Sequence, residues 1–172
     1  MKKAILGVLI SIPLLCFAQK LKKNEVDPFT GQLVRQTSWK TLRHKSAHTS
    51  YFSVRKIDTR VFLDFRAIMG PGGTYFSIPR GAYFMIKLQN DSIVTLHNLT
   101  PAYASDGQGA IGFYGSAATG ISVTYGLDEK EVALLLKNPA TQFRFCTSIG
   151  PYTFDLKKGG AEKLRKALAL VQ

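Results

Sequence analysis

Histidines are the side chains of this sequence best suited to metal binding, and they are few. His44 and His48 stand four residues apart, a spacing that on a helix would place both imidazoles on one face and could chelate zinc. A zinc site needs at least a third ligand, and His97 is the only other histidine. No HExxH motif is present, so we expect residues 44–48 to be a solvated basic turn between strands.

Cys146 is the cysteine with a plausible place in the fold. It lies in an apolar segment, residues 143–147, which predicts a strand with an inert, buried thiol. Arg144 would share its strand face, which leaves a reactive thiol as the alternative. The sequence contains no GxSxG elbow, no P-loop and no calcium loop, and it does not by itself place two acids at the separation that glycoside hydrolysis requires. We therefore expect no catalytic residue, no metal and no cofactor.

Residues 99–120 are the least regular part of the sequence and contain five glycines. Residues 107–112 match the GxGxxG pattern of dinucleotide sites, but the element expected next is a strand rather than a helix, so we interpret the match as chance. Loops of this length in compact domains are often functional. We expect one wall of a ligand or partner site here, with the covering of a sheet edge as the alternative. The predicted site residues are Tyr103, Asp106, Gln108, Phe113, Tyr114 and Ser116.

The chain is strongly basic, with 23 Lys and Arg against 11 Asp and Glu and a formal net charge of +12. The basic residues concentrate in three segments, 20–23, 35–56 and 157–166. Such a surface attracts anionic partners, for example nucleic acid, lipid headgroups or lipopolysaccharide. We predict an anionic-surface site at Lys45, Arg55 and Lys56, and the alternative is a solvated basic face.

The first 18 residues have the pattern of a secretory signal peptide. Two lysines precede an apolar run over residues 4–17, which is too short to span a bilayer, and Ala18 precedes a polar chain. Cleavage after Ala18 leaves 21 Lys and Arg (23 less two) against 11 Asp and Glu, a net charge of +10, and no second cysteine for a disulfide. Lipidation of Cys16 is the alternative. We expect a periplasmic or secreted protein, without a transmembrane span in the mature chain and without an intracellular nucleic-acid partner.

Hydrophobic periodicity supplies the elements that must position these residues. Residues 19–30 are polar and aperiodic and are expected to be an extended leader before a single domain over residues 31–172. Period-two alternation and turn residues predict strands over residues 33–42, 51–57, 61–66, 74–78, 82–89, 92–98, 121–125, 141–147 and 152–157.

Two helices are expected in the last third of the chain. Asp128 and Glu131 form a capping box for a helix that Pro139 ends. The spacing of Leu164, Leu168 and Val171 predicts a terminal amphipathic helix. The fold expectation is α+β, a mostly antiparallel sheet of about nine strands with two helices, and the alternative is a β-sandwich with appended helices.

Three segments carry a resemblance to known proteins. They are the signal peptide ending in Phe-Ala-Gln, the Val-Asp-Pro-Phe-Thr-Gly segment at residues 26–31, and the final Ala-Glu-Lys-Leu-Arg-Lys-Ala-Leu segment at residues 161–168. Together they resemble small exported proteins of Bacteroides-type Gram-negative bacteria, a group without a characterised activity. The resemblance implies a Gram-negative envelope setting and carries over no catalytic residue.

These observations favour a non-catalytic exported protein that binds a protein partner, a glycan, an envelope polyanion or another anionic surface. One alternative is an envelope hydrolase acting on polysaccharide or peptide, which would need two convergent titratable groups. The other is a structural subunit of a surface assembly, which would need an exposed apolar patch or an open sheet edge.

Overall fold

The computed structural model describes residues 20–45, 48–71, 75–108 and 118–172. The expected signal peptide therefore lies outside the described residues, as do Phe113, Tyr114 and Ser116 of the predicted loop site. The described elements are β1 (Leu21–Val26), β2 (Leu33–Thr37), β3 (Lys40–Lys45), β4 (His48–Ile57), β5 (Arg60–Pro71), β6 (Ser77–Ile78), β7 (Tyr83–Leu88), β8 (Ile93–His97), β9 (Ala102–Tyr103), β10 (Ser105–Asp106), β11 (Ala118–Leu127), α1 (Glu129–Lys137), β12 (Ala140–Thr147), β13 (Gly150–Asp155) and α2 (Lys158–Val171).

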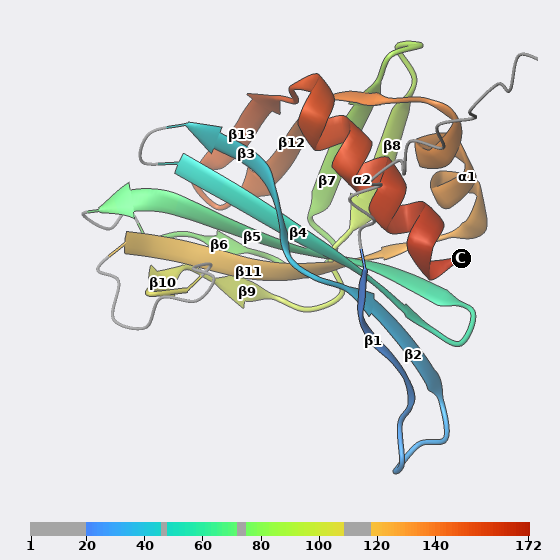
Figure 1. Ribbon diagram of the computed structural model, residues 1–172. Helices are drawn as coiled ribbons and strands as arrows, with labels where there is room; N and C mark the ends of the chain where they lie inside the picture. Colours follow the sequence, from blue (N-terminus) through green and yellow to red (C-terminus); the bar gives the residue numbers. More distant parts are fainter. Residues whose placement is uncertain (1–19, 46–47, 72–74, 109–117) are drawn as a thin grey trace, which may run out of the picture.

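The strands form two main antiparallel sheets. The large sheet has the order β1-β2-β4-β5-β11-β10, with β3 also pairing with β4, and the four-stranded sheet has the order β13-β12-β7-β8. A short β6-β9 pair stands apart from both. Figure 1 shows α2 lying across the strands and the β1–β2 hairpin projecting away from the body. The expectation of a mostly antiparallel α+β fold with two late helices is confirmed.

One aromatic core joins the two sheets. Alternate residues of β5 point into it, and the Phe65 ring lies 5.1 Å from Phe84, 5.9 Å from Phe143 and 5.4 Å from Phe145 between ring centroids. Edge-on and tilted ring pairs at these distances are favourable beyond the area they bury. Phe65 comes from the large sheet and the other three rings come from β7 and β12, so the core lies between the sheets.

Both helices form as their sequence patterns predict. In α1 the Glu131 amide donates to Asp128 Oδ1 and the Asp128 amide donates to Glu131 Oε2, each at 2.7 Å, which completes the capping box. In α2 the residues at the predicted spacing, Leu164, Leu168 and Val171, are buried in the core. Burial of this apolar stripe holds α2 against β2, β3 and β4.

The β4–β5 hairpin is also confirmed, because Ile57 pairs with Arg60 across a two-residue turn. Asp58 takes a φ of 50° in this turn, a conformation that Asp tolerates better than most residues. The predicted first strand, residues 33–42, is instead broken into β2 and β3. At the break the Thr37 hydroxyl accepts a hydrogen bond from the Val54 amide (2.9 Å), so a side chain replaces the regular backbone pairing.

Two segments that the sequence leaves without regular structure contain strands. The expected leader contains β1, which pairs with β2 along its length. Of its residues only Leu21 is even half-buried, so β1 lacks the alternation that makes a strand visible in sequence. The expected loop over residues 99–120 contains β9 and β10, and β11 begins at Ala118. Main-chain hydrogen bonds form these short strands, and such bonds leave no side-chain pattern.

Candidate functional site

A cavity of about 610 Å³ opens between β3 and the start of α2. We call it the basic groove. Its lining consists of residues 41–44 of β3, Asp155 at the end of β13, and Lys157, Gly159, Gly160 and Lys163 at the start of α2. The groove therefore joins two basic segments that lie at opposite ends of the sequence.

A β-bulge in β3 aims the residues of one wall. The pairing of β3 with β4 shifts register between Thr41 and Arg43. A bulge bends the strand and re-aims its side chains. Leu42 is buried in the core, while the Arg43 guanidinium lies over the Phe154 ring of β13, 4.7 Å from its centroid. The aromatic face holds this guanidinium by a cation–π contact, and Arg43 lines both the groove and a small hollow that it shares with Phe154.

The start of α2 forms the other wall. A Cβ atom at Gly160 would lie 2.5 Å from the Leu42 carbonyl oxygen, so only glycine allows the helix to approach β3 this closely. The N-cap residue is Lys157, which makes no side-chain capping hydrogen bond, and the first turn contains no acidic residue. The positive end of the helix dipole therefore faces the groove, where Asp155 is the one carboxylate of the lining.

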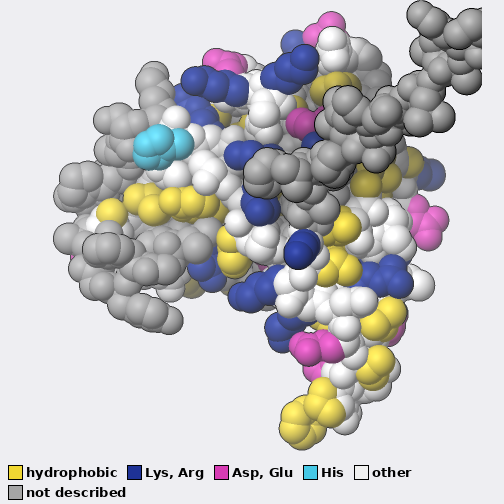
Figure 2. Space-filling view, viewed as in Figure 1, with side chains coloured by type: hydrophobic (Ala, Val, Ile, Leu, Met, Phe, Trp, Pro, Cys, Tyr) yellow, Lys and Arg dark blue, Asp and Glu magenta, His cyan; other side chains and the backbone are white. Residues whose placement is uncertain are grey.

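Few negative charges offset the cations of the groove. Asp155 is the only carboxylate in its lining, and its Oδ1 accepts a hydrogen bond from Gln142 Nε2 at 2.9 Å. Glu162 is turned to Arg165 (2.9 Å) and Lys166 (3.7 Å). Within the part of the chain that the structure describes, Arg43, Lys157 and Lys163 make no ion pair. Figure 2 shows Lys and Arg side chains gathered over α2 and the neighbouring strands.

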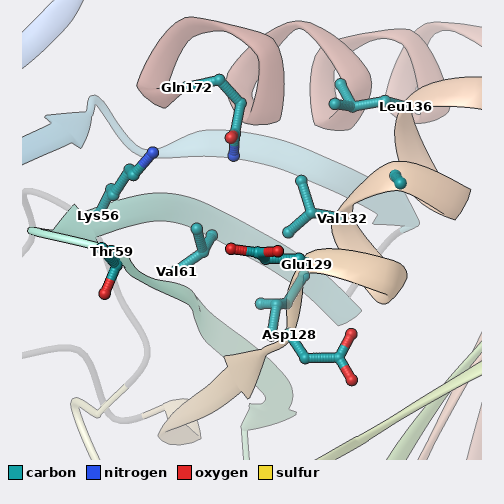
Figure 3. Close-up of a pocket in the computed structure, with 10 residues that line it drawn as sticks. Lys56, Thr59, Val61, Asp128, Glu129, Val132, Leu136 and Gln172 are labelled. Atoms are coloured by element: carbon teal, nitrogen blue, oxygen red, sulfur yellow. The ribbon is translucent and has the colours of Figure 1, made fainter.

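A second cavity, of about 350 Å³, lies between the β4–β5 hairpin and α1. Figure 3 shows the side chains of Lys56, Glu129 and Gln172 around this cavity, which Val61 and Val132 also line. Asp128 also lines it, but its carboxylate caps α1. Because Lys56 here stands among acidic residues, this cavity has mixed charge and is less suited to an anion than the basic groove.

The structure does not bring Lys45, Arg55 and Lys56 together as one anionic-surface site. Lys56 lines the cavity beside α1, whereas Arg55 lies on the opposite face of β4 and forms an ion pair with Asp64 at 3.2 Å. Neighbouring residues of a strand point to opposite faces, which explains the separation. Lys45 ends β3, where its backbone pairs with His48. The basic groove instead contains Arg43 and His44, from the same strand as Lys45.

Among the described residues of the predicted loop site, Asp106 is the centre of a small polar cluster with Tyr75 and Thr119. Asp106 accepts hydrogen bonds from the Tyr75 hydroxyl and the Thr119 hydroxyl, each at 3.1 Å. This contact with the carboxylate raises the pKa of Tyr75. Tyr103 is 70% exposed on β9, and the Gln108 carbonyl lies so close to Gly120 that a side chain there would clash. Tyr75 is not among the residues predicted for this site from the sequence. It reaches the loop because β6, which follows it in the chain, pairs with β9.

The other residues with potential chemistry lie apart. His44 and His48 are on paired strands rather than on a helix, and His44 Nδ1 is 2.7 Å from the Thr49 hydroxyl. Cys146 is half-buried rather than fully buried, and its contact raises the pKa of Tyr83. Among the described residues no group of three or more His, Cys, Asp or Glu side chains could hold a metal ion.

The basic segments 35–56 and 157–166 are each evident in the sequence, but their meeting in one groove is not. Gly160 is the residue that could have linked them, because a glycine in the first turn of an amphipathic helix marks a close approach. No helix in the described part of the chain is long and apolar enough to cross a membrane. Comparison of the chain with protein-family models, with curated proteins and with solved structures gives no significant match.

Proposed function

We propose that this protein is an exported, non-catalytic binding module that holds a phosphate or sulfate group of an envelope glycan or glycolipid in the basic groove. The export signal and the resemblance to proteins of the Gram-negative envelope support the setting. The groove supports the chemistry, because its cations have no paired carboxylate.

The observation that carries the proposal is the meeting of Arg43, Lys157 and Lys163 around one cavity at the start of a helix. Three cations with one carboxylate among them repel one another, and a bound anion relieves that repulsion. The helix start adds partial positive charge and main-chain N–H groups, which suit a tetrahedral oxyanion. A cavity of about 610 Å³ is in the size range that holds a small ligand or a few units of a chain.

The groups in the groove divide the work of binding. The Arg43 guanidinium, fixed over Phe154, offers a planar fork that fits two oxygens of one phosphate or sulfate. Lys157 and Lys163 are exposed and flexible and contribute as point charges. Binding by such a set falls with salt, because exposed charges are screened over roughly 10 Å at 0.1 M.

The test uses residues 19–172, because every described strand and helix lies between Leu21 and Val171. Binding is measured by calorimetry across a salt series with three probes: inorganic phosphate, phosphorylated lipopolysaccharide and the same lipopolysaccharide after dephosphorylation. We expect binding to both phosphate-bearing probes, with tighter binding to the glycolipid if the saccharide also contacts the groove, and loss of binding after dephosphorylation.

Lys163→Glu should weaken this binding by about tenfold or more, since a reversed charge replaces an attraction of roughly 1 kcal/mol with a repulsion. Lys130→Glu on α1 makes the same charge change on an exposed residue outside the groove and is the matched control. Equal losses in the two variants, or no binding to any probe at low salt, would overturn the proposal.

A further inference from the structure

The β1–β2 hairpin is a second feature that calls for a partner. It projects from the body of the molecule (Figure 1), and in β1 every residue after Leu21 is exposed. β2 pairs with β4 through residues 34–36, which pair in turn with residues 23–25 of β1, so residues 26–32 extend beyond the sheet. The far end of the hairpin therefore adds almost nothing to the core.

The tip of the hairpin is nevertheless a fixed turn. Asp27 Oδ1 accepts hydrogen bonds from the amides of Phe29 (2.9 Å) and Thr30 (3.0 Å). The Asp27 carbonyl accepts from the Gly31 amide at 2.8 Å, and Gly31 takes the positive φ of 70° that favours glycine. These amides lower the pKa of Asp27 and keep its charge directed into the turn.

The fixed turn presents apolar side chains to solvent. Phe29 is 97% exposed, more than any other large hydrophobic side chain in the described residues. Behind it, Val26 and Leu33 pair across the two strands and are 59% and 37% exposed. A rigid turn that holds a phenylalanine in water is unfavourable unless a partner covers the ring.

The charges near the hairpin favour an anionic partner. Glu25 forms an ion pair with Lys23 at 3.2 Å, whereas Asp27 and Asp58 keep their charge and accept hydrogen bonds from main-chain amides. The exposed cations Lys20, Lys22 and Arg60 make no ion pair among the described residues. Figure 2 shows hydrophobic side chains at the end of the hairpin and Lys and Arg side chains nearer its base.

We propose that the β1–β2 hairpin is a lipid anchor, in which Phe29, Val26 and Leu33 enter the interface of a bilayer while the cations at the base contact anionic headgroups. An apolar end followed by a cationic base is the arrangement of interfacial membrane anchors. A second copy of this chain is a poorer partner, because a formal charge of +10 on each copy of residues 19–172 opposes self-association. This site lies outside the basic groove and does not depend on it.

The test is partition of residues 19–172 onto vesicles of phosphatidylcholine alone or with phosphatidylglycerol. We expect binding to the anionic vesicles that weakens with salt, and about tenfold weaker binding for Phe29→Ala, the loss expected for leaving one buried aromatic ring in water. Ile149→Ala removes an exposed apolar side chain from the β12–β13 turn and should leave binding unchanged. Lys163→Glu in the groove should have little effect, whereas Phe29→Ala should leave binding of inorganic phosphate unchanged.

Insertion itself is read with Phe29→Trp and lipids brominated on their acyl chains. We expect quenching of the new indole and none in the parent, whose single tryptophan, Trp39, lies elsewhere in the fold. Absence of vesicle binding at low salt, binding that Phe29→Ala does not weaken, or an unquenched indole at position 29 would each overturn the anchor.

Discussion

The adjacent glycines at the start of α2 test how the helix is seated on β3. At Gly160 a Cβ atom would lie 2.5 Å from the Leu42 carbonyl oxygen and 3.3 Å from Leu156 Cδ2, whereas at Gly159 it would meet nothing within 4 Å. Both residues belong to the first turn, and neither has a positive φ. The two alanine variants therefore make the same chemical change in opposite surroundings.

The expected effects have opposite signs. Replacing glycine by alanine in a helix gains up to about 1 kcal/mol, and roughly half of that in a first turn, so Gly159→Ala should stabilise the protein by about 0.5 kcal/mol. In Gly160→Ala the same gain is opposed by a clash with a main-chain atom that the pairing of β3 with β4 holds in place. Overpacking of this kind costs about 1–3 kcal/mol, which leaves a net loss of about 0.5–2.5 kcal/mol.

Urea unfolding of residues 19–172, followed by far-ultraviolet circular dichroism, measures the difference. The midpoints should move in opposite directions with an unchanged slope, because neither variant alters the surface exposed on unfolding. A separation of about 2 kcal/mol corresponds to roughly 4–8 °C between the two melting temperatures. If Gly160→Ala were as stable as the parent, or if both variants shifted alike, the close seating of α2 on β3 would be refuted.

Two further predictions concern carboxylates. Asp64→Asn should lower the free energy of unfolding by about 1–3 kcal/mol, because it removes the charge that pairs with Arg55 at a nearly buried site. Asp91→Asn, which removes the charge of an exposed ion pair, should change the free energy of unfolding by less than about 0.5 kcal/mol. Urea titrations measure both variants, and equal effects would contradict this prediction. Asp106→Asn should lower the raised pKa of Tyr75, measured by nuclear magnetic resonance of labelled tyrosines. The stability from that contact is present below the ordinary pKa of tyrosine and is lost as pH rises through the raised value. If the pKa of Tyr75 were the same in Asp106→Asn as in the parent, Asp106 would not be the cause of the raised pKa.

Elements with a strong local signal could be predicted from the sequence. The capping box of α1, the apolar stripe of α2 and the alternation on both sides of Asp58 all act between near neighbours, so each is visible without knowledge of the fold. The excess of basic residues and their three clusters are likewise properties of the sequence alone. Alternation also implies that Arg55 and Lys56 face opposite sides of β4. The predicted anionic-surface site ignored this, because it grouped basic residues by their proximity in the sequence.

Tertiary structure decided which of these pieces meet. β1 forms because its backbone pairs with that of β2. The exposed, polar side chains of β1 show no alternation that would predict this pairing. Arg43 and Lys163 line the same cavity because α2 packs closely on β3, which the absence of a Cβ atom at Gly160 allows. The bulge in β3 also changes the direction of the side chains that follow Thr41. Local periodicity sets which face of an element is apolar. Contacts between distant segments depend on backbone pairing and close packing, and the type of a single residue does not reveal them. The sequence by itself therefore determined a basic antiparallel α+β domain, and only the packing of α2 on β3 gathered its charge into a groove.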